Sequence, residues 1–283
     1  MPCARRRLND NGGMNQHIAF IGGGNMASAL ISGLLGKGIL AAQIDVVEPF
    51  DEARVKVKSS FGITAMAEPG DALAQATLVV WAVKPQTFKE AALHTRASTI
   101  NALHLSVAAG ITSDSIARWL GTERVVRAMP NTPALIGKGI TGLFARPGVS
   151  AVDRQSVEQV IATTGEWLWL DDEQLLDGVT ALSGSGPAYM FYFMEAMTEA
   201  GVQMGLAREQ AYKLAVATCI GAGELARAST ESPEVLRQRV TSKGGTTHAA
   251  ITSMEQSNIK NLFMQALHAA QIRARAMGEE LGG

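Results

Sequence analysis

Short apolar segments alternate with helix-like segments through the first 170 residues of the chain, and the alternation then stops. The apolar segments are rich in the Val, Ile and Leu of buried strands, and none approaches the ~20 residues that a membrane span needs. They occupy residues 17–21, 44–48, 77–83, 103–110, 124–130, 139–145 and 165–170. Because such strands need helices on both faces, they predict an α/β fold with a mostly parallel sheet.

The first apolar segment ends in a glycine-rich turn, "HIAFIGGGNMASAL". Gly22, Gly24 and Ala27 form Gly-x-Gly-x-x-Ala between a strand and a helix, which is the context required for a dinucleotide fingerprint. Gly22 permits the tight turn, Gly24 the approach of a pyrophosphate, and Ala27 close packing on the sheet. The helix start, including Asn25 and Met26, supplies N–H donors for phosphates. A Rossmann-type domain that binds NADH or NADPH is therefore expected.

Three further segments at strand ends are candidates for the same site. Glu48 ends the second strand, where an acid normally binds the adenosine ribose and repels a 2′-phosphate, so it favours NADH. An ordinary exposed glutamate is the alternative. "AVKPQ" and "AAG" follow the next two strands, and open α/β sheets bind ligands at such ends. Lys84-Pro85 is also compatible with a plain turn.

Only helix-like patterns remain after about residue 172. They cover residues 173–182, 187–205, 208–228, 233–240, 246–256 and 258–281. The predicted parts are an extension over residues 1–13, a Rossmann domain over residues 14–171 and an all-helical domain over residues 172–283. The extension is basic without the apolar core of a signal peptide, so a disordered segment and an upstream start codon both remain open.

Composition argues against several classes of protein. The net charge is −1 and no long basic run follows residue 7, so nucleic-acid binding has little electrostatic support. The two cysteines, Cys3 and Cys219, are too distant to suggest a disulfide framework, and neither has a metal-ligand spacing to a histidine. We expect a cytoplasmic protein with no metal, nucleic-acid or membrane partner.

The helix predicted from Pro187 is apolar around most of its circumference. Its apolar residues include Tyr189, Met190, Phe191, Tyr192, Phe193, Met194 and Met197. Such a helix is normally buried on all sides, and a segment of about 110 residues has little core to bury it in. We therefore infer a partner subunit, with a central helix of this single chain as the alternative.

The stretch "TSKGGTTHAAI" interrupts two helices late in the chain. N–H groups around Gly244 and Gly245 form an anion-binding concavity, and the following helix start reinforces it. The hydroxyls of Ser242, Thr246 and Thr247 add donors, which suits a small carboxylate. A capped helix–turn–helix without a ligand is equally consistent with these residues.

The histidines give no independent catalytic signal. His248 stands near a helix start, where a general acid and a surface residue are both open, the second being more typical. His17, His94, His104 and His268 show neither a triad nor a metal spacing, and the chain has no nucleophile elbow and no HExxH motif.

Five segments together resemble the pyrroline-5-carboxylate reductase family, which catalyses the last step of proline synthesis. They are "FIGGGNMASAL", "WAVKPQ", "RAMPNTP", "ALSGSGPAY" and "PEVLRQRVTSKGGTTHAAITSMEQ". The resemblance runs from about Met14 to the C-terminus, and the last two segments are specific to the family. It implies hydride transfer from NADH or NADPH to the imine carbon of 1-pyrroline-5-carboxylate, giving L-proline.

The resemblance also implies an assembly and a set of site residues. The helical domain would intertwine two subunits, whose dimers often form decamers, and the site would join the nicotinamide end to the neighbouring helical domain. The loop Ser242–Thr247 would hold the substrate carboxylate, and Thr247 would be the catalytic residue that hydrogen-bonds the ring nitrogen. The residues implied to line the cofactor are Val83, Lys84, Pro85, Ala108, Ala109, Gly110, Met129, Pro130, Asn131 and Glu173.

The chemistry agrees with the missing acid–base pair. A cyclic imine with a carboxylate needs an anion site, a hydrogen-bond partner for nitrogen and a hydride donor. Because the iminium can arrive already protonated, no strong side-chain acid is required, and catalysis is mainly positioning.

Some positions depart from the family pattern. Glu48 and Glu68-Pro69 weaken a preference for NADPH, which leaves both dinucleotides open, and Lys243 replaces a proline found in some relatives. A β-hydroxyacid dehydrogenase would need a catalytic lysine, but Lys213, Lys243 and Lys260 lack its sequence context. A non-catalytic nucleotide sensor would have no use for the hydroxyl-rich loop.

Overall fold

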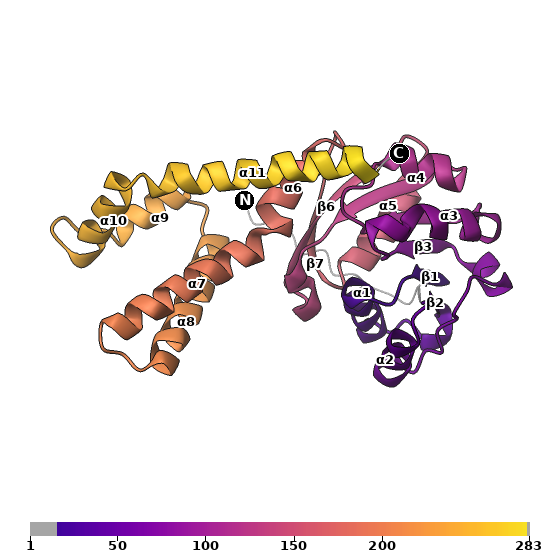
Figure 1. The fold of residues 1–283 in the computed structure, drawn as a ribbon, viewed down its shortest axis with the longest axis horizontal. Helices are drawn as coiled ribbons and strands as arrows, with labels where there is room; N and C mark the ends of the chain where they lie inside the picture. Colours follow the sequence, from indigo (N-terminus) through magenta and orange to yellow (C-terminus); the bar gives the residue numbers. More distant parts are fainter. Residues whose placement is uncertain (1–15, 282–283) are drawn as a thin grey trace. The chain divides into compact units, whose positions relative to one another are not determined.

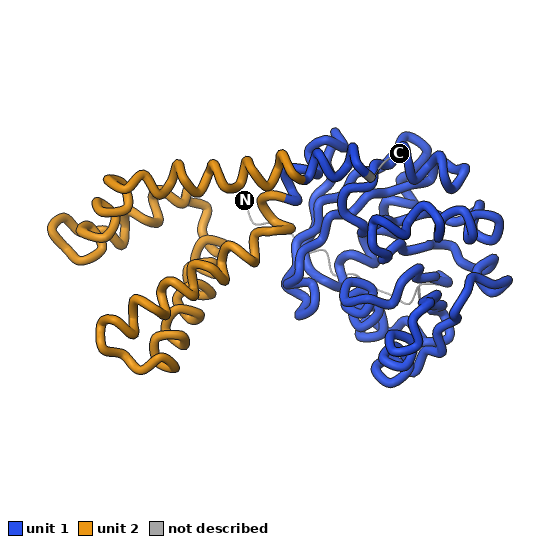
Figure 2. Tube along the Cα trace, in the orientation of Figure 1, with its two compact units in different colours: residues 1–180, 274–283 blue, residues 181–273 orange. Residues whose placement is uncertain are grey.

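The computed structural model describes residues 16–281, so the predicted extension over residues 1–13 lies outside the described residues. The chain divides into two compact units, coloured separately in Figure 2. Unit 1 comprises the residues up to Thr180 together with those from Ala274 onward, and unit 2 comprises Ala181–Arg273. The last helix, α11 (Ile259–Leu281), therefore contributes to both units.

Unit 1 contains a seven-stranded sheet in the order β2-β1-β3-β4-β5-β6-β7. All neighbouring strands run parallel except β5 and β6, so the predicted mostly parallel sheet is confirmed. The strands are β1 (Ile18–Ile21), β2 (Ile44–Val47), β3 (Leu78–Trp81), β4 (Leu103–Ser106), β5 (Val125–Met129), β6 (Gly139–Ala145) and β7 (Gly165–Trp169).

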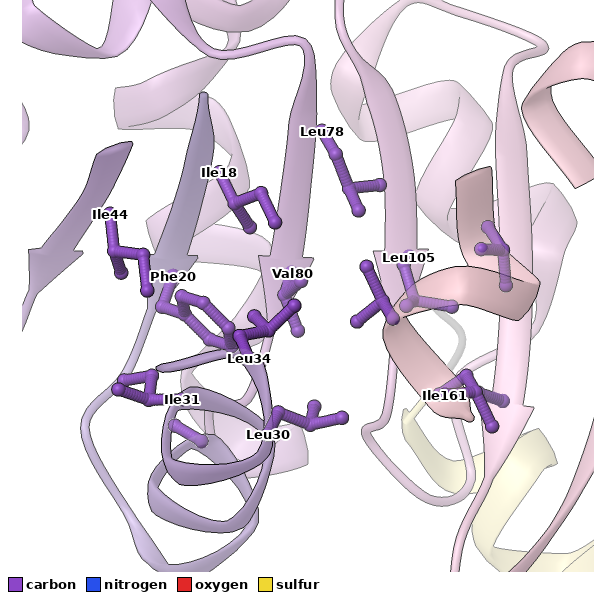
Figure 3. Close-up of a cluster of buried hydrophobic side chains, with 14 of the residues drawn as sticks. Ile18, Phe20, Leu30, Ile31, Leu34, Ile44, Leu78, Val80, Leu105 and Ile161 are labelled. Carbon is purple, nitrogen blue, oxygen red and sulfur yellow. The ribbon is translucent and has the colours of Figure 1, made fainter. Parts of the chain in front are cut away.

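Helices cover both faces of this sheet (Figure 1). The covering helices are α1 (Asn25–Gly36), α2 (Asp51–Phe61), α3 (Pro85–Thr99), α4 (Ser113–Leu120) and α5 (Ala151–Ile161). Successive strand residues point to opposite faces. Ile18 and Phe20 therefore join the core under α1, where Leu30 and Leu34 are buried (Figure 3). The intervening Ala19 and Ile21 join a second core under α3 and α4.

Short helical turns complete unit 1. Three are 3₁₀ turns, at Ala41–Gln43, Asp71–Gln75 and Thr132–Ile136. After β7 the chain forms the short helix α6 (Leu175–Val179) and then a π-helical turn, Thr180–Gly184, where one helix over residues 173–182 was expected.

All the regular secondary structure of unit 2 is helical. Besides the first part of α11 it contains α7 (Gly186–Gln203), α8 (Arg208–Ala228), α9 (Pro233–Arg239) and α10 (Thr246–Gln256), at nearly the predicted positions. Helices α7 and α8 pack closely, since a Cβ added at Gly201 would lie 2.7 Å from that of Ala211. No helix among the described residues is long and apolar enough to cross a membrane.

Helix α7 is not the buried central helix of this chain. Its side chains at Phe191 and Tyr192 are 64% and 71% exposed. The apolar circumference that the sequence predicts is therefore present, but one copy of the chain does not cover it.

Candidate active site

The carboxyl ends of the parallel strands meet at one edge of the sheet, and most of the predicted cofactor residues follow those ends. Strand β1 lies between β2 and β3, so the connections from β1 to β2 and from β2 to β3 diverge at this edge. Open α/β sheets bind ligands at such a switch point. The turn at Gly22–Ala27 leaves β1 at this point, while Glu48 and Val83 follow the two flanking strands.

The turn after β1 has the geometry that the fingerprint predicts. Gly22 adopts φ +97°, and a Cβ there would lie 2.5 Å from the carbonyl oxygen of Ala82. Gly24 precedes α1, and nothing lies within 4 Å of where its Cβ would be, so the backbone there is open to a ligand. No side chain caps α1, whose first N–H groups, at Asn25 and Met26, have no partner within the helix. Such a start suits the pyrophosphate of a dinucleotide.

Glu48 is not an ordinary exposed glutamate. It is buried directly after β2, and its Oε2 accepts a hydrogen bond of 2.7 Å from the backbone N–H of Gly23. Its Oε1 accepts one of 3.0 Å from the N–H of Phe50. The carboxylate thus fastens the glycine-rich turn to the end of β2 and places a negative charge beside it.

The other predicted cofactor segments also lie at this edge. Lys84 precedes α3 and Pro85 is its first residue, so this dipeptide starts a helix. Ala108, Ala109 and Gly110 form the turn after β4, where Gly110 adopts φ +73°.

At the end of β5, Met129 is half-buried and Pro130 is buried. The Oδ1 atom of Asn131 accepts a hydrogen bond of 3.0 Å from the N–H of Ile140. This bond ties the segment after β5 to the beginning of β6. The asparagine is thus part of the frame at the carboxyl edge.

Glu173 takes part in a partly buried ionic network in unit 1. Its Oε1 accepts hydrogen bonds of 2.6 Å from Arg127 and from the backbone N–H of Ser113. Its Oε2 accepts one from the hydroxyl of Ser113 at 2.5 Å. Arg146 also donates to that hydroxyl, at 3.2 Å. The network joins the start of α4 to β5 and to the chain beyond β7.

The predicted carboxylate loop lies in unit 2, between α9 and α10. Gly244 adopts φ +76°, and the N–H of Gly245 donates to the carbonyl of Ser242 at 3.0 Å. Gly245 precedes α10, and no side chain caps that helix. Thr246 is exposed and Thr247 is half-buried. Because they are the first two residues of α10, their N–H groups have no acceptor inside the helix.

The loop lacks the side-chain cap of the alternative interpretation. His248 is the exposed third residue of α10. Among the described residues no three His, Cys, Asp or Glu side chains gather as metal ligands would.

Two family models match this chain, one in each half. The model described as pyrroline-5-carboxylate reductase dimerisation matches residues 173–277, and the one described as NADP oxidoreductase, coenzyme F420-dependent, matches residues 17–110. A pyrroline-5-carboxylate reductase of Pseudomonas aeruginosa is 47% identical over 94% of this chain and 98% of its own length. The chain belongs to the pyrroline-5-carboxylate reductase family. This confirms the resemblance and the oxidoreductase class predicted from the sequence.

Solved structures of the pyrroline-5-carboxylate reductase family show the same fold. The enzyme of Coxiella burnetii superposes with a TM-score of 0.86 at 38% identity, covering 95% of this chain and 99% of that one. The Plasmodium falciparum pyrroline carboxylate reductase, with NADP bound, superposes with a TM-score of 0.83 at 28% identity. That match covers 93% of this chain and 98% of the other.

Two polar residues of this family member escaped the sequence analysis. Ser113 and Arg127 hold Glu173, and neither was named as a site residue, although Arg127 begins the segment "RAMPNTP". A signal was present for each. Arg127 is a charged residue inside the apolar strand "RVVRAMP", and Ser113 follows the helix-capping Thr112 in "ITSDS". A charge in a buried strand needs a partner, which points to an acid elsewhere in the chain.

Proposed function

We propose that this chain reduces 1-pyrroline-5-carboxylate to L-proline with a nicotinamide dinucleotide. The uncapped helix start behind Gly244 and Gly245 carries the proposal, because it offers N–H donors and hydroxyls to a small carboxylate. Relatives that match this chain over 94% and 92% of its length are named pyrroline-5-carboxylate reductases. The activity of those relatives thus coincides with the chemistry of the loop.

The roles of the loop residues follow from the substrate. The N–H groups of Thr246 and Thr247 and the hydroxyls of Ser242 and Thr246 bind the carboxylate. The hydroxyl of Thr247 orients the ring nitrogen, which carries its proton already, so that the adjacent carbon is the electrophile. Rate enhancement comes from holding that carbon in place and from stabilising the amine being formed.

The dinucleotide supplies the hydride when it is bound. Its phosphates fit the open, uncapped turn at Gly22–Ala27, and its nicotinamide end is assigned to the segments after β3, β4 and β5. The residues assigned to the dinucleotide are Gly22, Gly24, Asn25, Met26, Ala27, Glu48, Val83, Lys84, Pro85, Ala108, Ala109, Gly110, Met129, Pro130 and Asn131, whereas Glu173, which the resemblance also implies, is bonded to Ser113 and Arg127. Of the two dinucleotides NADH is preferred, because the buried charge of Glu48 repels a 2′-phosphate.

The working form is a homo-oligomer built on a dimer. Exposed apolar side chains on α7 and α8 support self-association, as does the match to the dimerisation model. Assembly to a decamer and a cytoplasmic location remain predictions from the sequence.

Turnover of the purified protein tests the proposal. Nicotinamide absorbance is followed with 1-pyrroline-5-carboxylate and either NADH or NADPH, for wild type, Thr247→Ala and Thr252→Ala. We expect wild-type turnover and a loss in kcat/KM on the order of 10²-fold for Thr247→Ala, since one oriented hydrogen bond disappears. Thr252, further along α10, is the control and should behave as wild type. A folded wild type that binds dinucleotide without turnover would contradict the proposed function.

A further inference from the structure

Glu173 is bonded to two residues that stand next to the proposed cofactor segments. Both of its carboxylate oxygens are bonded, to Arg127 and to two donor groups of Ser113. The side chains of Glu173 and Arg127 are only 21% and 11% exposed, so solvent screens this pair weakly. Hydrogen bonds between charged groups in such surroundings are among the strong ones.

The partners of Glu173 flank the segments assigned to the nicotinamide end. Ser113 begins α4, only three residues after Gly110, the last residue of the turn beyond β4. Arg127 lies on β5, two residues before Met129. Glu173 therefore bridges two of the three segments that line the proposed cofactor site, and it does so from outside both.

The turn beyond β4 has a neighbour from the end of the chain. A Cβ added at Gly278, in the last turns of α11, would lie 3.8 Å from the carbonyl oxygen of Gly110. Ala274, one turn earlier, is buried within unit 1. The backbone of α11 thus passes close to Gly110, and the chain directly after this turn is anchored at Ser113.

We propose that Glu173 is a positioning residue for hydride transfer, which holds the turn at Ala108–Gly110 and the end of β5 in register through Ser113 and Arg127. The expected change in kcat rests on the proposed function. In this role Glu173 does not bind the dinucleotide itself but fixes the positions of the two protein segments that line its site. A shift of about 1 Å at a reacting group can cost on the order of 10²-fold in rate, so a frame of this kind affects kcat.

A second acid makes the arrangement sensitive to the charge of Glu173. Asp177 lies in α6, four residues after Glu173. Burial raises the pKa of Asp177, and the charges of Arg127 and Arg275 oppose that rise. Without the charge of Glu173, Asp177 is the carboxylate left near Arg127. When Glu173 is replaced by glutamine, we therefore expect Arg127 to turn toward Asp177 and the start of α4 to be held less firmly, because Ser113 loses its charged acceptor.

The test compares Glu173→Gln and Ser113→Ala, singly and together, with Asp171→Asn as the control. Asp171 is an exposed acid two residues before Glu173, so its variant removes the same charge outside the network. For Glu173→Gln we expect kcat to fall on the order of 10-fold or more, with KM for the pyrroline substrate within about twofold. The double variant should lose no more than Glu173→Gln, since both act through one contact.

Hydrogen exchange measured by mass spectrometry reports how firmly these segments are held, and it does not require catalytic activity. Glu173→Gln should speed exchange in peptides spanning residues 107–117 by about tenfold, whereas peptides at Gly22–Ala27 and all peptides of Asp171→Asn should match wild type. Unchanged exchange in Glu173→Gln would overturn the inference whether or not the protein turns over. So would wild-type kcat in that variant, while an inactive wild type would overturn the proposed function alone.

Discussion

Glu48 combines two tasks in one side chain. It fastens the glycine-rich turn through Gly23 and Phe50, and it brings a buried negative charge to the adenosine side of the proposed site. The first task affects both dinucleotides equally, because both carry the same pyrophosphate. The second affects only the dinucleotide with a 2′-phosphate.

Replacement of Glu48 by glutamine should separate these tasks. We expect lower kcat/KM with both dinucleotides, since a charged acceptor for two N–H groups is lost, and a ratio of NADPH to NADH that rises about five- to tenfold. That change corresponds to on the order of 1 kcal/mol, as expected for removing one repulsive charge. Steady-state kinetics with both dinucleotides give the ratio. Glu52→Gln, an exposed acid on α2, is the control, and an unchanged ratio in Glu48→Gln would remove Glu48 from cofactor discrimination.

His104 links stability to pH, although it has no place in the site. Its Nδ1 accepts a hydrogen bond of 3.1 Å from the indole N–H of Trp81, and its Nε2–H donates to the carbonyl of Thr99 at 3.1 Å. This arrangement needs the neutral ring. Burial lowers the pKa of His104 to about 4, the bond to Thr99 opposes the shift, and the charge of Arg124 adds to it.

The sign of the pH effect follows from that lowered pKa. Because the unfolded chain takes up the proton near pH 6.5, the stabilisation is complete above that pH and is lost as pH falls toward 4. The loss for this group is about 3 kcal/mol in the free energy of unfolding. His104→Gln should flatten the stability profile between pH 6.5 and 4, measured by urea denaturation. His94→Gln, on an exposed position of α3, should retain the wild-type profile, and equal slopes in all three proteins would refute the assignment.

At the scale of elements, the strands were predictable because both faces of the sheet are covered. Burial on both faces makes every residue of β1 and β3 apolar, and that leaves a clear apolar run in the sequence. The runs over 77–83 and 103–110 extend beyond their strands, because the chain stays largely apolar where it leaves the sheet edge. The π-helical turn at Thr180–Gly184 was not predictable, since one extra residue in a helical turn leaves the apolar pattern almost unchanged.

In the candidate site, features formed by adjacent residues were predictable from the sequence, and bonds between residues far apart in the sequence were not. The loop before α10 was predictable, since a glycine pair between two helical patterns is a feature of adjacent residues. The bond from Gly23 to Glu48 spans 25 residues, and those from Glu173 to Arg127 and Ser113 span 46 and 60. Such pairs depend on strand order and on which side chains the edge of the sheet brings together. Sequence patterns therefore placed the residues at the edge and left their bonds unknown.

At the scale of the whole molecule, the main feature is an apolar surface on α7 and α8 that one copy of the chain leaves exposed to solvent. A groove of about 570 Å³ lies in unit 2 between α7 and α8, lined mainly by apolar side chains that include Phe191, Met194, Tyr212 and Ile220. Large exposed apolar patches mark interfaces in soluble proteins. On α2, by contrast, exposed apolar side chains such as Val55 stand on a mostly polar helix.

Phe191→Glu should therefore shift the protein from an oligomer toward the single chain. A carboxylate in an apolar interface loses its hydration without gaining a partner, which costs several kcal/mol and raises the dissociation constant by on the order of 10²-fold or more. Light scattering coupled to size-exclusion chromatography gives the mass, and circular dichroism checks that the helices persist.

Val55→Glu introduces the same charge at an equally exposed apolar position on unit 1 and should keep the wild-type mass. A monomeric wild type, or a Phe191→Glu variant with unchanged mass across dilution, would show that this surface is not the interface. If mass and turnover fall together in Phe191→Glu alone, the proposed activity requires the assembled form, and the uncovered helices of the single chain are explained by catalysis as well as by burial.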